Sequence, residues 1–586
     1  MVAHVAGQSD GNPFFAEELI LSLAQSGVLL GERGRYRLAP SGWQNPTLPT
    51  TVEAVIGARI DLLPESEKVL LQTAAIIGKE FPFEVVRAVI GLPDTAARPL
   101  LAQLRAAELI QLRQTAMGES FAFRHPLIQE VAYAMQLRST RTTLHAVVAQ
   151  AIEGQEWARR DEFAGLLAHH YEAAGNMVAA AMHLQRSARW VGRTNSGRAL
   201  ADWKKIRRMM QDQPRSKEND ELRALAGGQL LTFGWREGMP VEEAKTYVEE
   251  ALGYARGAGN RRHEALLIAG YGRIVAASGS ADDYIRLVRE ALAVLDAEAN
   301  PAEALLLNGL LCQANMLAGF VGDALSANSA ALDLIDREGR GAAGIVLGLT
   351  AGQMVGFDVP YWIKCLQVRS LVMLGRFSDA DERLARLFQA EQADTEPLHR
   401  GIPHFSAVEL AWLRNDTLAA TRHADQLARF ATEAMNPYWS VVASYCQGLA
   451  ASAAGDCMEA DGFFQQALDA SRRGRAGLEL EARILAFQAD NLMRAGDPGR
   501  AGEVAAEAIA VARRKADRLA ECHASLVAAR ACLTRSGSQF AGEVRGLLNR
   551  ANALIDETGA KAYDAIMLRV RAQAGEKSLA SARRSL

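Results

Sequence analysis

The apolar positions of residues 1–153 predict a series of short elements. Apolar side chains follow Pro13 at helical spacing as far as Leu23, which predicts a helix that begins at Pro13 and ends at Gly27. Short alternating runs joined by turn residues predict a hairpin made by 28–30 and 36–38. Further helices are predicted from Thr50 or Thr51 to Leu63, over 64–78, near 83–90, over 94–107 and from Pro126 onward, with two strands at 109–113 and 120–124.

Three helices followed by a two-stranded hairpin are typical of a winged-helix domain, which we predict for residues 46–153. Such a domain can bind DNA through its third helix. Here that segment, 94–109, carries Arg98 and Arg105 among alanines and leucines, together with the acidic Glu108. Because a helix that reads bases carries a denser basic and polar face, we expect a packing module and no nucleic-acid partner.

Proline usage separates this region from the rest of the chain. Nine of the 17 prolines lie at or before Pro126, and the others are spread thinly over the remaining sequence. Proline is excluded from helix interiors. Residues 154–586 are therefore predicted to form a long helical array, and the whole protein to be mostly α.

The array has a countable repeat. Turn-type residues recur at intervals of 41, 40, 56, 40, 40, 41 and 41 residues: Gly238, Gly279, Gly319, Gly375, Asn415, Gly455, Gly496 and Gly537. An alanine follows five residues later at Ala324, Ala380, Ala420, Ala460 and Ala501, and an aliphatic residue preceded by alanine follows thirteen residues later at Leu292, Leu332, Leu468 and Ile509. A helical hairpin needs a turn residue between its helices and a small residue where they cross. The pattern predicts a tetratricopeptide-like α-solenoid, with one extra helix in the interval of 56 residues.

Composition narrows the classes of protein. Hydrophobic residues make up 49% of the chain but aromatic residues only 6%, which suits closely packed helices. A net charge of −3 argues against a protein that coats nucleic acid or an anionic membrane. The six cysteines form no C-x-x-C pair, so we expect buried side chains in a reducing compartment and a cytoplasmic protein.

The longest uncharged segment bears on whether the chain spans a membrane. Residues 341–357 form an uncharged run of 17 residues, shorter than the roughly 20 that a membrane span needs. Within it Gly344, Gly348, Gly352 and Gly356 recur every fourth residue, on one face of a helix. Such a ridge can be a dimerisation face in a membrane. We favour close packing of helices in water instead, with an oligomer contact near Gly344–Gly356 as a possible use, and predict no membrane span.

Catalytic and metal-binding patterns are missing from the sequence. It contains no G-x-x-x-x-G-K-[ST], H-E-x-x-H or G-x-S-x-G motif and no paired-cysteine zinc spacing. His169 and His170 are adjacent, so on a helix they point about 100° apart and do not easily share one metal ion. We expect them to make an ordinary contact between helices. We predict no catalytic residue and no metal site, so the chain itself is expected not to be an enzyme.

Two phrases carry a family resemblance. They are Gly11-Asn12-Pro13-Phe14-Phe15, and Phe123-Arg124-His125-Pro126-Leu127 with its continuation to Tyr133. Together with the runs at 48–52, 58–64 and 72–81, they resemble the region after the ATPase core of bacterial STAND/AAA-type signalling ATPases. The set is similar to proteins that join a class III adenylate/guanylate cyclase, an ATPase and tetratricopeptide repeats. The match covers about residues 5–153.

The resemblance implies nucleotide contacts at four residues. Pro13 would lie near the adenine, Gly11 and Asn12 would shape that turn, and His125 would sense a diphosphate. The alternatives are that Pro13 only begins a helix and that His125 only shapes a turn. The phosphate loop, the magnesium-binding aspartate and the cyclase domain of the family are absent from the sequence. We therefore expect no cofactor in this chain, and ATP or ADP only in a complete parent protein.

These observations predict three domains: an ATPase lid remnant (1–45), a winged-helix domain (46–153) and a repeat array (154–586). The favoured function is a regulatory and sensor segment, in which the concave face of the repeats binds a protein or small-molecule signal. Met1 is then expected to be an internal residue of a longer parent. The alternative is a stand-alone interaction scaffold. A transcription regulator is a third hypothesis, but the tail from Gly559 to Leu586 shows no helix-turn-helix pattern.

Overall fold

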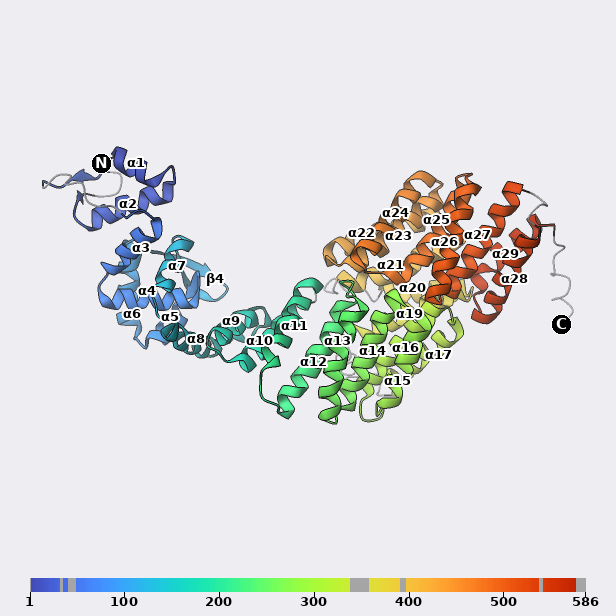
Figure 1. Cartoon of the computed structure of the whole chain (residues 1–586), viewed down its shortest axis with the longest axis horizontal. Helices are drawn as coiled ribbons and strands as arrows, with labels where there is room; N and C mark the ends of the chain where they lie inside the picture. The colour runs from blue at the N-terminus through green and yellow to red at the C-terminus, as the bar shows by residue number, and fades with distance from the viewer. Residues whose placement is uncertain are drawn as a thin grey trace. The chain divides into compact units, whose positions relative to one another are not determined.

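The computed structural model of the chain describes residues 2–31, 35–40, 49–192, 194–337, 358–389, 397–536 and 541–575. The chain divides into two compact units, Met1–Ser187 and Ala188–Leu586. In Figure 1 the first unit runs from blue to teal and the second from green to red. The predicted domain divisions after residues 45 and 153 both fall inside the first unit.

The first unit is built from short helices. They are α1 (Val2–Ser9), α2 (Pro13–Gln25), α3 (Val52–Asp61), α4 (Glu65–Ile77), α5 (Phe83–Ile90), α6 (Asp94–Ala106), α7 (Pro126–Ala134), α8 (Arg138–Glu153) and α9 (Ala164–Ala173), with the 3-10 turns η1 (Glu156–Arg159) and η2 (Asp161–Phe163). The helix α10 (Met177–Val191) crosses the division between the units. The predicted helices between Pro13 and Ala134 are confirmed within a few residues. Thr51, rather than Thr50, caps α3, because its hydroxyl accepts the Ala54 N–H at 3.2 Å.

Two small sheets complete this unit. β1 (Leu29–Leu30) and β2 (Arg37–Leu38) form the predicted hairpin, and β3 (Glu80–Pro82), β4 (Ile110–Thr115) and β5 (Gly118–Phe123) form an antiparallel sheet in the order β3-β5-β4. The pair β4–β5 confirms the second predicted hairpin. β3 was not predicted, because three residues are too few to show an alternating pattern. Its Phe81 stacks on Phe121 of β5 with ring centroids 5.9 Å apart, and both rings lie in the core.

The face of α6 is used within the unit. Arg98 donates to both carboxylate oxygens of Glu119 on β5 at 3.0 Å and lies 4.3 Å over the Phe83 ring. This basic side chain therefore has partners inside the unit. The contact suits a packing helix.

The second unit consists of helices in sequence-adjacent pairs. Its helices are α11 (Ser196–Gln211), α12 (Lys217–Gly234), α13 (Val241–Gly257), α14 (Arg261–Ser278), α15 (Ala281–Val294), α16 (Pro301–Ala318), α17 (Val321–Arg337), α19 (Val359–Met373), α20 (Phe377–Gln389), α21 (Pro397–Arg414), α22 (Thr417–Ala434), α23 (Pro437–Ala454), α24 (Cys457–Gly474), α25 (Glu481–Arg494), α26 (Pro498–Lys515), α27 (Arg518–Ser536), α28 (Ala541–Thr558) and α29 (Asp564–Gln573), with the 3-10 turns η3 (Leu478–Leu480) and η5 (Lys561–Tyr563). The pairs begin with α12 and α13, and each pair packs on the next (Figure 1). The predicted tetratricopeptide-like solenoid is confirmed in this architecture.

The repeat positions have the predicted structural role. Those from Gly238 to Gly496 lie in the turn between the two helices of a pair, and all of them except Gly279 have a positive φ. The alanines five residues later are fully buried: Ala324, Ala380, Ala420, Ala460 and Ala501. Thirteen residues on, the alanine before the aliphatic residue is fully buried as well, at Ala291, Ala331, Ala467 and Ala508. Small side chains therefore set how closely the helices cross. Gly537, the Gly344–Gly356 ridge and the extra helix predicted there lie outside the described residues.

The first helices of the pairs line the inner face of the solenoid. First helices of neighbouring pairs, such as α12 and α14 or α21 and α23, pack directly on each other. Contacts between the second helices of neighbouring pairs are sparse. The stack therefore curves, with its first helices on the concave side.

The solenoid coils back on itself along a contact that we call the seam. Lys515 Nζ donates to Ala277 O at 2.8 Å, and Arg518 donates to both carboxylate oxygens of Asp282 at 3.0 and 3.2 Å. A buried ion pair joins Arg273 to Glu479. Gly238, between α12 and α13, lies so close to the end of α24 that a Cβ atom on it would be 2.0 Å from Gly474 O, so only glycine fits there.

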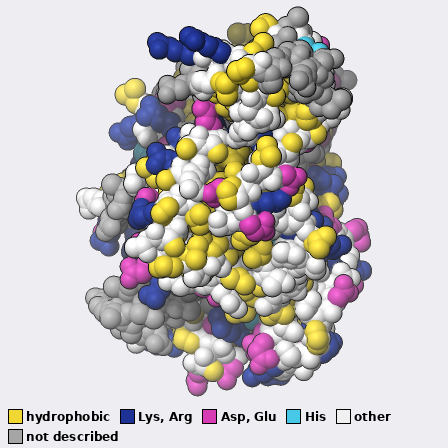
Figure 2. Space-filling view, turned by 90° about the vertical axis from the view of Figure 1, so that its left-hand side faces the viewer, with side chains coloured by type: hydrophobic (Ala, Val, Ile, Leu, Met, Phe, Trp, Pro, Cys, Tyr) yellow, Lys and Arg dark blue, Asp and Glu magenta, His cyan; other side chains and the backbone are white. Residues whose placement is uncertain are grey.

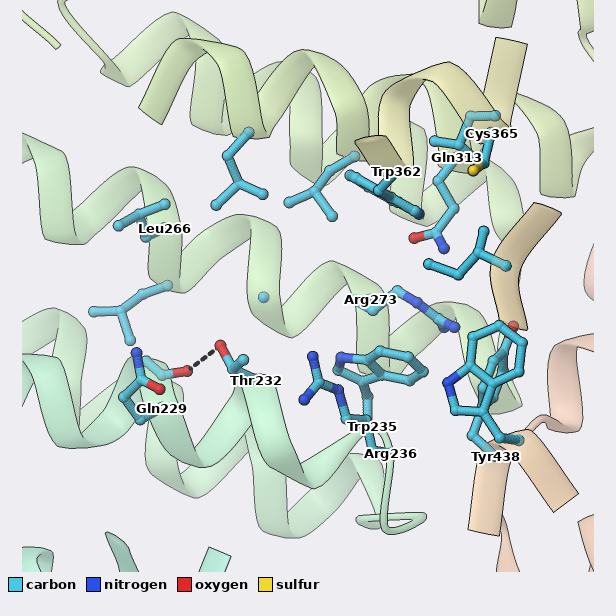
Figure 3. A pocket seen from close by; sticks show the side chains of 18 of the residues that line it. Gln229, Thr232, Trp235, Arg236, Leu266, Arg273, Gln313, Trp362, Cys365 and Tyr438 are labelled. Carbon is cyan, nitrogen blue, oxygen red and sulfur yellow. Dashed lines mark hydrogen bonds between the residues drawn. The ribbon is translucent and has the colours of Figure 1, made fainter. Parts of the chain in front are cut away.

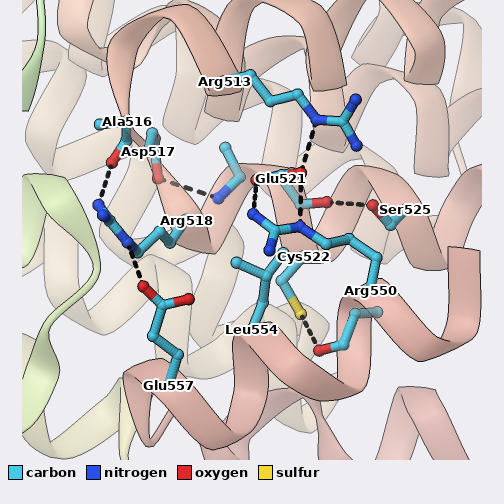
Figure 4. A network of polar contacts seen from close by, with 12 residues as sticks. Arg513, Ala516, Asp517, Arg518, Glu521, Cys522, Ser525, Arg550, Leu554 and Glu557 are labelled. Carbon is cyan, nitrogen blue, oxygen red and sulfur yellow. Dashed lines mark hydrogen bonds and ion pairs between the residues drawn. The ribbon is translucent and has the colours of Figure 1, made fainter.

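A polar network fixes the end of the seam (Figure 4). The buried Glu521 carboxylate accepts from Arg513 at 2.8 Å and from Arg550 at 2.8 and 3.0 Å. Arg518 donates at 2.7 Å to Glu557. These bonds connect α26, α27 and α28 at the point where Arg518 contacts the earlier pairs.

The surface and the cysteines fit the composition. On the face drawn in Figure 2, basic, acidic and apolar side chains are interspersed. Cys312, Cys365, Cys446 and Cys522 are buried, as expected, whereas Cys457 and Cys532 are partly exposed. Among the helices in the described ranges, none combines the length and apolar character that crossing a bilayer requires.

Candidate functional site

The predicted nucleotide-contact residues form the start of α2. The Asn12 side chain caps this helix by accepting the Phe14 and Phe15 N–H groups at 3.1 and 3.2 Å. Pro13 occupies the first helical position, where its missing N–H costs nothing. Gly11 has a φ of 78°, which permits the sharp turn before the cap. All three residues are exposed.

His125 lies beside this turn. Its ring stacks on Phe14 with centroids 3.7 Å apart and an interplanar angle of 18°. Its Nδ1 accepts the Leu127 N–H at 3.2 Å, so His125 is the N-cap of α7 and its Nε2 remains as a donor. The structure therefore brings together the two predicted groups, and each of them also has a structural function as a helix cap.

Arg59 connects the start of α2, where Gly11, Asn12 and Pro13 lie beside His125, to the rest of the first unit. We call this group of four residues the corner. It is buried and forms an ion pair with the buried Glu18 of α2. Its Nη2 donates at 2.7 Å to the carbonyl of Ala107, just after α6. Sequence reasoning included Arg59 in a family motif but assigned it no role. A single arginine within α3 gives no local sign of a partner 41 residues away along the chain.

The adjacent histidines make the interhelix contact that was expected. His170 Nδ1 lies 2.9 Å from His145 Nδ1, and His145 Nε2 lies 3.2 Å from the Tyr133 hydroxyl. Burial, helped by neighbouring positive charge, lowers the pKa of His145 to about 4 and that of His170 to about 3. Across the described part of the chain, no cluster of His, Cys, Asp or Glu could hold a metal ion.

A well-defined concave site lies in the second unit, on the inner face of the solenoid. It is a cavity of about 360 Å³, lined by residues from Arg189 in α10 to Trp439 in α23. Its wall comes from the first helices of the pairs: α12, α14, α16, α19, α21 and α23. The volume lies in the range of small-molecule sites. This cavity is the candidate functional site.

The lining combines aromatic rings with arginines. The large apolar side chains include Trp235, Trp362, Phe405, Tyr438 and Trp439, and the arginines are Arg189, Arg236, Arg262, Arg273 and Arg369. No aspartate or glutamate is among the lining residues that the structure describes. The carboxylates that pair with three of these arginines, Glu303, Glu479 and Glu409, are buried behind the wall.

One end of the cavity adjoins the seam (Figure 3). There the Arg273 guanidinium lies 4.3 Å over the Trp235 ring, and Trp235 meets Tyr438 edge-on with centroids 5.1 Å apart. Burial, with help from the Glu479 carboxylate, raises the pKa of Tyr438 to about 12, so its hydroxyl remains protonated at neutral pH. A molecule at this end would contact both sides of the seam: the earlier helix pairs, which carry Trp235 and Arg273, and the later pair, which carries Tyr438. We call these two sides the earlier and the later turn of the solenoid.

Two features of the lining bear on its chemistry. Burial lowers the pKa of His263, which favours its neutral form, and raises the pKa of the Cys365 thiol, which disfavours the reactive thiolate. The arrangement therefore favours binding over nucleophilic attack. Sequence reasoning predicted ligand binding on the concave face but named none of these residues, because they are brought together only by superhelical coiling.

Sequence similarity to a known protein extends over part of the chain. No protein-family model matches the chain. An uncharacterized protein of Rhizobium meliloti is 30% identical over 177 residues, which cover 28% of this chain and 16% of that protein. The chain thus matches only a small part of that relative's length.

Two solved structures are similar at low level. A signal transduction ATPase with numerous domains (STAND) and a tetratricopeptide repeat sensor, from Pyrococcus horikoshii, has a TM-score of 0.39 and 10% identity, and covers 98% of this chain and 71% of its own. The Rap protein in complex with competence and sporulation factor has a TM-score of 0.35 and 11% identity, and covers 68% of this chain and 99% of its own.

Proposed function

We propose that this chain is the signal-binding, regulatory part of a nucleotide-switch ATPase, with the solenoid as its sensor. The observation that carries the proposal is the cavity of about 360 Å³ on the inner face, lined by first helices from both turns of the solenoid. Repeat arrays use such concave faces for binding. A bound molecule there can change how firmly the turns hold together.

The seam supplies the coupling. Trp235 and Arg273 lie on the earlier turn, and Tyr438 and Glu479 lie on the later one. A ligand that contacts both turns binds the closed solenoid more tightly than an opened one. Such a difference in affinity is what shifts a conformational equilibrium.

The first unit would pass this change to the nucleotide switch. In this proposal residues 46–153 act as a winged-helix packing module, and the corner made by Gly11, Asn12, Pro13 and His125 faces a nucleotide held by the parent's ATPase core. We propose that the chain has no turnover of its own and works in the cytoplasm. The cyclase is the proposed effector, on the resemblance of residues 5–153 alone.

The test begins with the DNA that encodes the chain. An in-frame phosphate-loop motif upstream of Met1 supports the switch, whereas a stop codon with no such motif refutes it and favours the scaffold.

If the motif is present, the complete protein is assayed for ATP hydrolysis with wild-type and Gly228→Leu chains. Gly228 lines the cavity, and a Cβ atom there would meet only Leu267 Cδ2 at 4.0 Å, so a leucine at this position places its side chain in the cavity. We expect Gly228→Leu to alter how ATP hydrolysis is regulated, and unchanged regulation in this variant would contradict the proposal.

A further inference from the structure

We infer that the cavity binds a small organic anion with a flat, aromatic body. This inference rests on the proposed sensor function and adds the chemical class of the ligand. It follows from three features of the described lining: the sign of its charge, an unsatisfied buried guanidinium and the aromatic walls.

The charge of the lining is one-sided. Five arginines face the cavity, while the glutamates that pair with Arg262, Arg273 and Arg369 lie behind the wall. The guanidinium groups are therefore the charged groups nearest to a bound molecule. A low-dielectric, basic pocket attracts anions and repels cations.

Arg273 has hydrogen-bonding capacity to spare. It is only 3% exposed, and its Nη2 pairs with Glu479, but Nε and Nη1 have no hydrogen-bond partner among the described residues. A buried donor without a partner destabilises the ligand-free protein. A ligand carboxylate, sulfonate or phosphate oxygen that accepts from Nη1 would form a charge-assisted hydrogen bond, whereas the Nε–H lies on another edge of the guanidinium and needs a second acceptor.

The walls indicate the shape of the ligand. Trp362 lies against α16 at Gly309, where a Cβ atom would come within 2.7 Å of its ring, so glycine is needed to seat this tryptophan. The Trp362 and Trp235 rings and the Phe405 side chain offer flat apolar surfaces. Gly228 and Gly270 leave the backbone of α12 and α14 open to the cavity. A planar ring fits such walls, and its acidic group would point to the seam end, where Arg273 lies (Figure 3).

The test uses two dyes with the same ring system. One is 8-anilinonaphthalene-1-sulfonate, which is anionic, and the other is N-phenyl-1-naphthylamine, which lacks the sulfonate. Fluorescence titration of the full chain is expected to give one anionic dye per chain, with a Kd about tenfold to a hundredfold lower than for the neutral dye. The Arg273→Gln substitution is expected to remove most of this difference. Because it also breaks the seam ion pair with Glu479, any weaker binding of the neutral dye to this variant reports the opening of the seam.

Two glycine variants separate cavity binding from adventitious dye binding. Gly228→Leu places a side chain in the cavity while all five arginines are retained, and it is expected to weaken binding of both dyes strongly. Gly253→Leu is the matched control, because Gly253 lies on the outer helix α13 with no atom within 4 Å of a Cβ, and it is expected to bind like the wild type.

The outcomes distinguish this inference from the proposed function. Equal affinity of the two dyes, with both strongly weakened in Gly228→Leu, would show that the cavity binds ligands but that the anionic class is wrong. Unweakened binding in Gly228→Leu would show that the cavity is not the site, which would also remove the basis of the sensor. If Arg273→Gln fails to fold, the comparison of the two dyes on the wild type still decides the question of charge.

Discussion

At the scale of single residues, buried histidines make the stability of the first unit depend on pH. The His145–His170 contact puts two ring nitrogens 2.9 Å apart, and Tyr133, His169 and Arg141 also face His145. One histidine donates and the other accepts, so the pair requires neutral rings. Folding lowers the pKa of His145 from 6.5 to about 4.

The sign of the effect follows from proton uptake. Between these two values the unfolded chain binds the proton and the folded chain does not, so the free energy of unfolding falls as the pH decreases below about 6.5. We expect the protection factors of α8 and α9, that is, exchange rates corrected for the intrinsic pH dependence of amide exchange, to fall between pH 6.5 and 4 in the wild type. His145→Gln should flatten this response, whereas the exposed His4→Gln should retain it. A response that is equally steep in His145→Gln would contradict this explanation.

Arg59 gives a second prediction at this scale. Arg59→Ala leaves Glu18 buried without its charge partner, which typically costs about 3–5 kcal/mol. We expect α2 and α3 to become sensitive to limited proteolysis. Arg87→Ala is the control, because Arg87 forms a solvent-screened surface pair with Glu84 that contributes little to stability. The double variant Arg59→Met, Glu18→Met should recover much of the loss, since it removes both charges. Resistance of Arg59→Ala to proteolysis would show that the pair is not needed.

At the scale of elements, a crossing alanine and an exposed glycine of the same helix should respond in opposite ways to added side-chain volume. Ala460 is fully buried where α24 crosses α23, so Ala460→Leu should destabilise the array by about 1–3 kcal/mol through overpacking. Gly462, two residues along the same helix, is exposed and has no atom within 4 Å of a Cβ. Gly462→Ala should therefore stabilise by about 0.4–1 kcal/mol. Urea-induced loss of helical circular dichroism measures both, and equal shifts in the two variants would refute the crossing role.

The sequence was most informative about such local features. The turn residues, the crossing alanines and the cap at Thr51 each depend on neighbours within a few residues, so their spacing is visible in the chain. The strand β3 escaped prediction because its pairing with β5 is set about 40 residues away along the chain. The seam and the cavity escaped it entirely, because Arg273 and Glu479 are 206 residues apart and no short-range pattern connects them.

At the scale of the whole molecule, the seam decides whether the solenoid of the second unit is closed or extended. Within a solenoid, each pair contacts mainly its neighbours, so breaking a long-range contact should open the coil and leave the pairs intact. Arg518 is the best residue for a test. It joins α27 to Asp282, to Glu557 and, at 3.3 Å, to the Ala318 carbonyl at the end of α16.

We expect Arg518→Ala to retain the helical content of the wild type but to expose the backbone of the α14–α15 and α16–α17 turns. Hydrogen exchange should accelerate at those turns, and small-angle scattering should give a larger radius of gyration. Arg386→Ala, which removes an exposed ion pair with Glu382 within one helix, is the matched control and should change neither measurement. If the opening of the seam is what a ligand opposes, the anionic dye should bind Arg518→Ala more weakly, although Arg518 does not line the cavity. An opened coil with unchanged dye affinity would separate the cavity from the seam and disprove the proposed coupling.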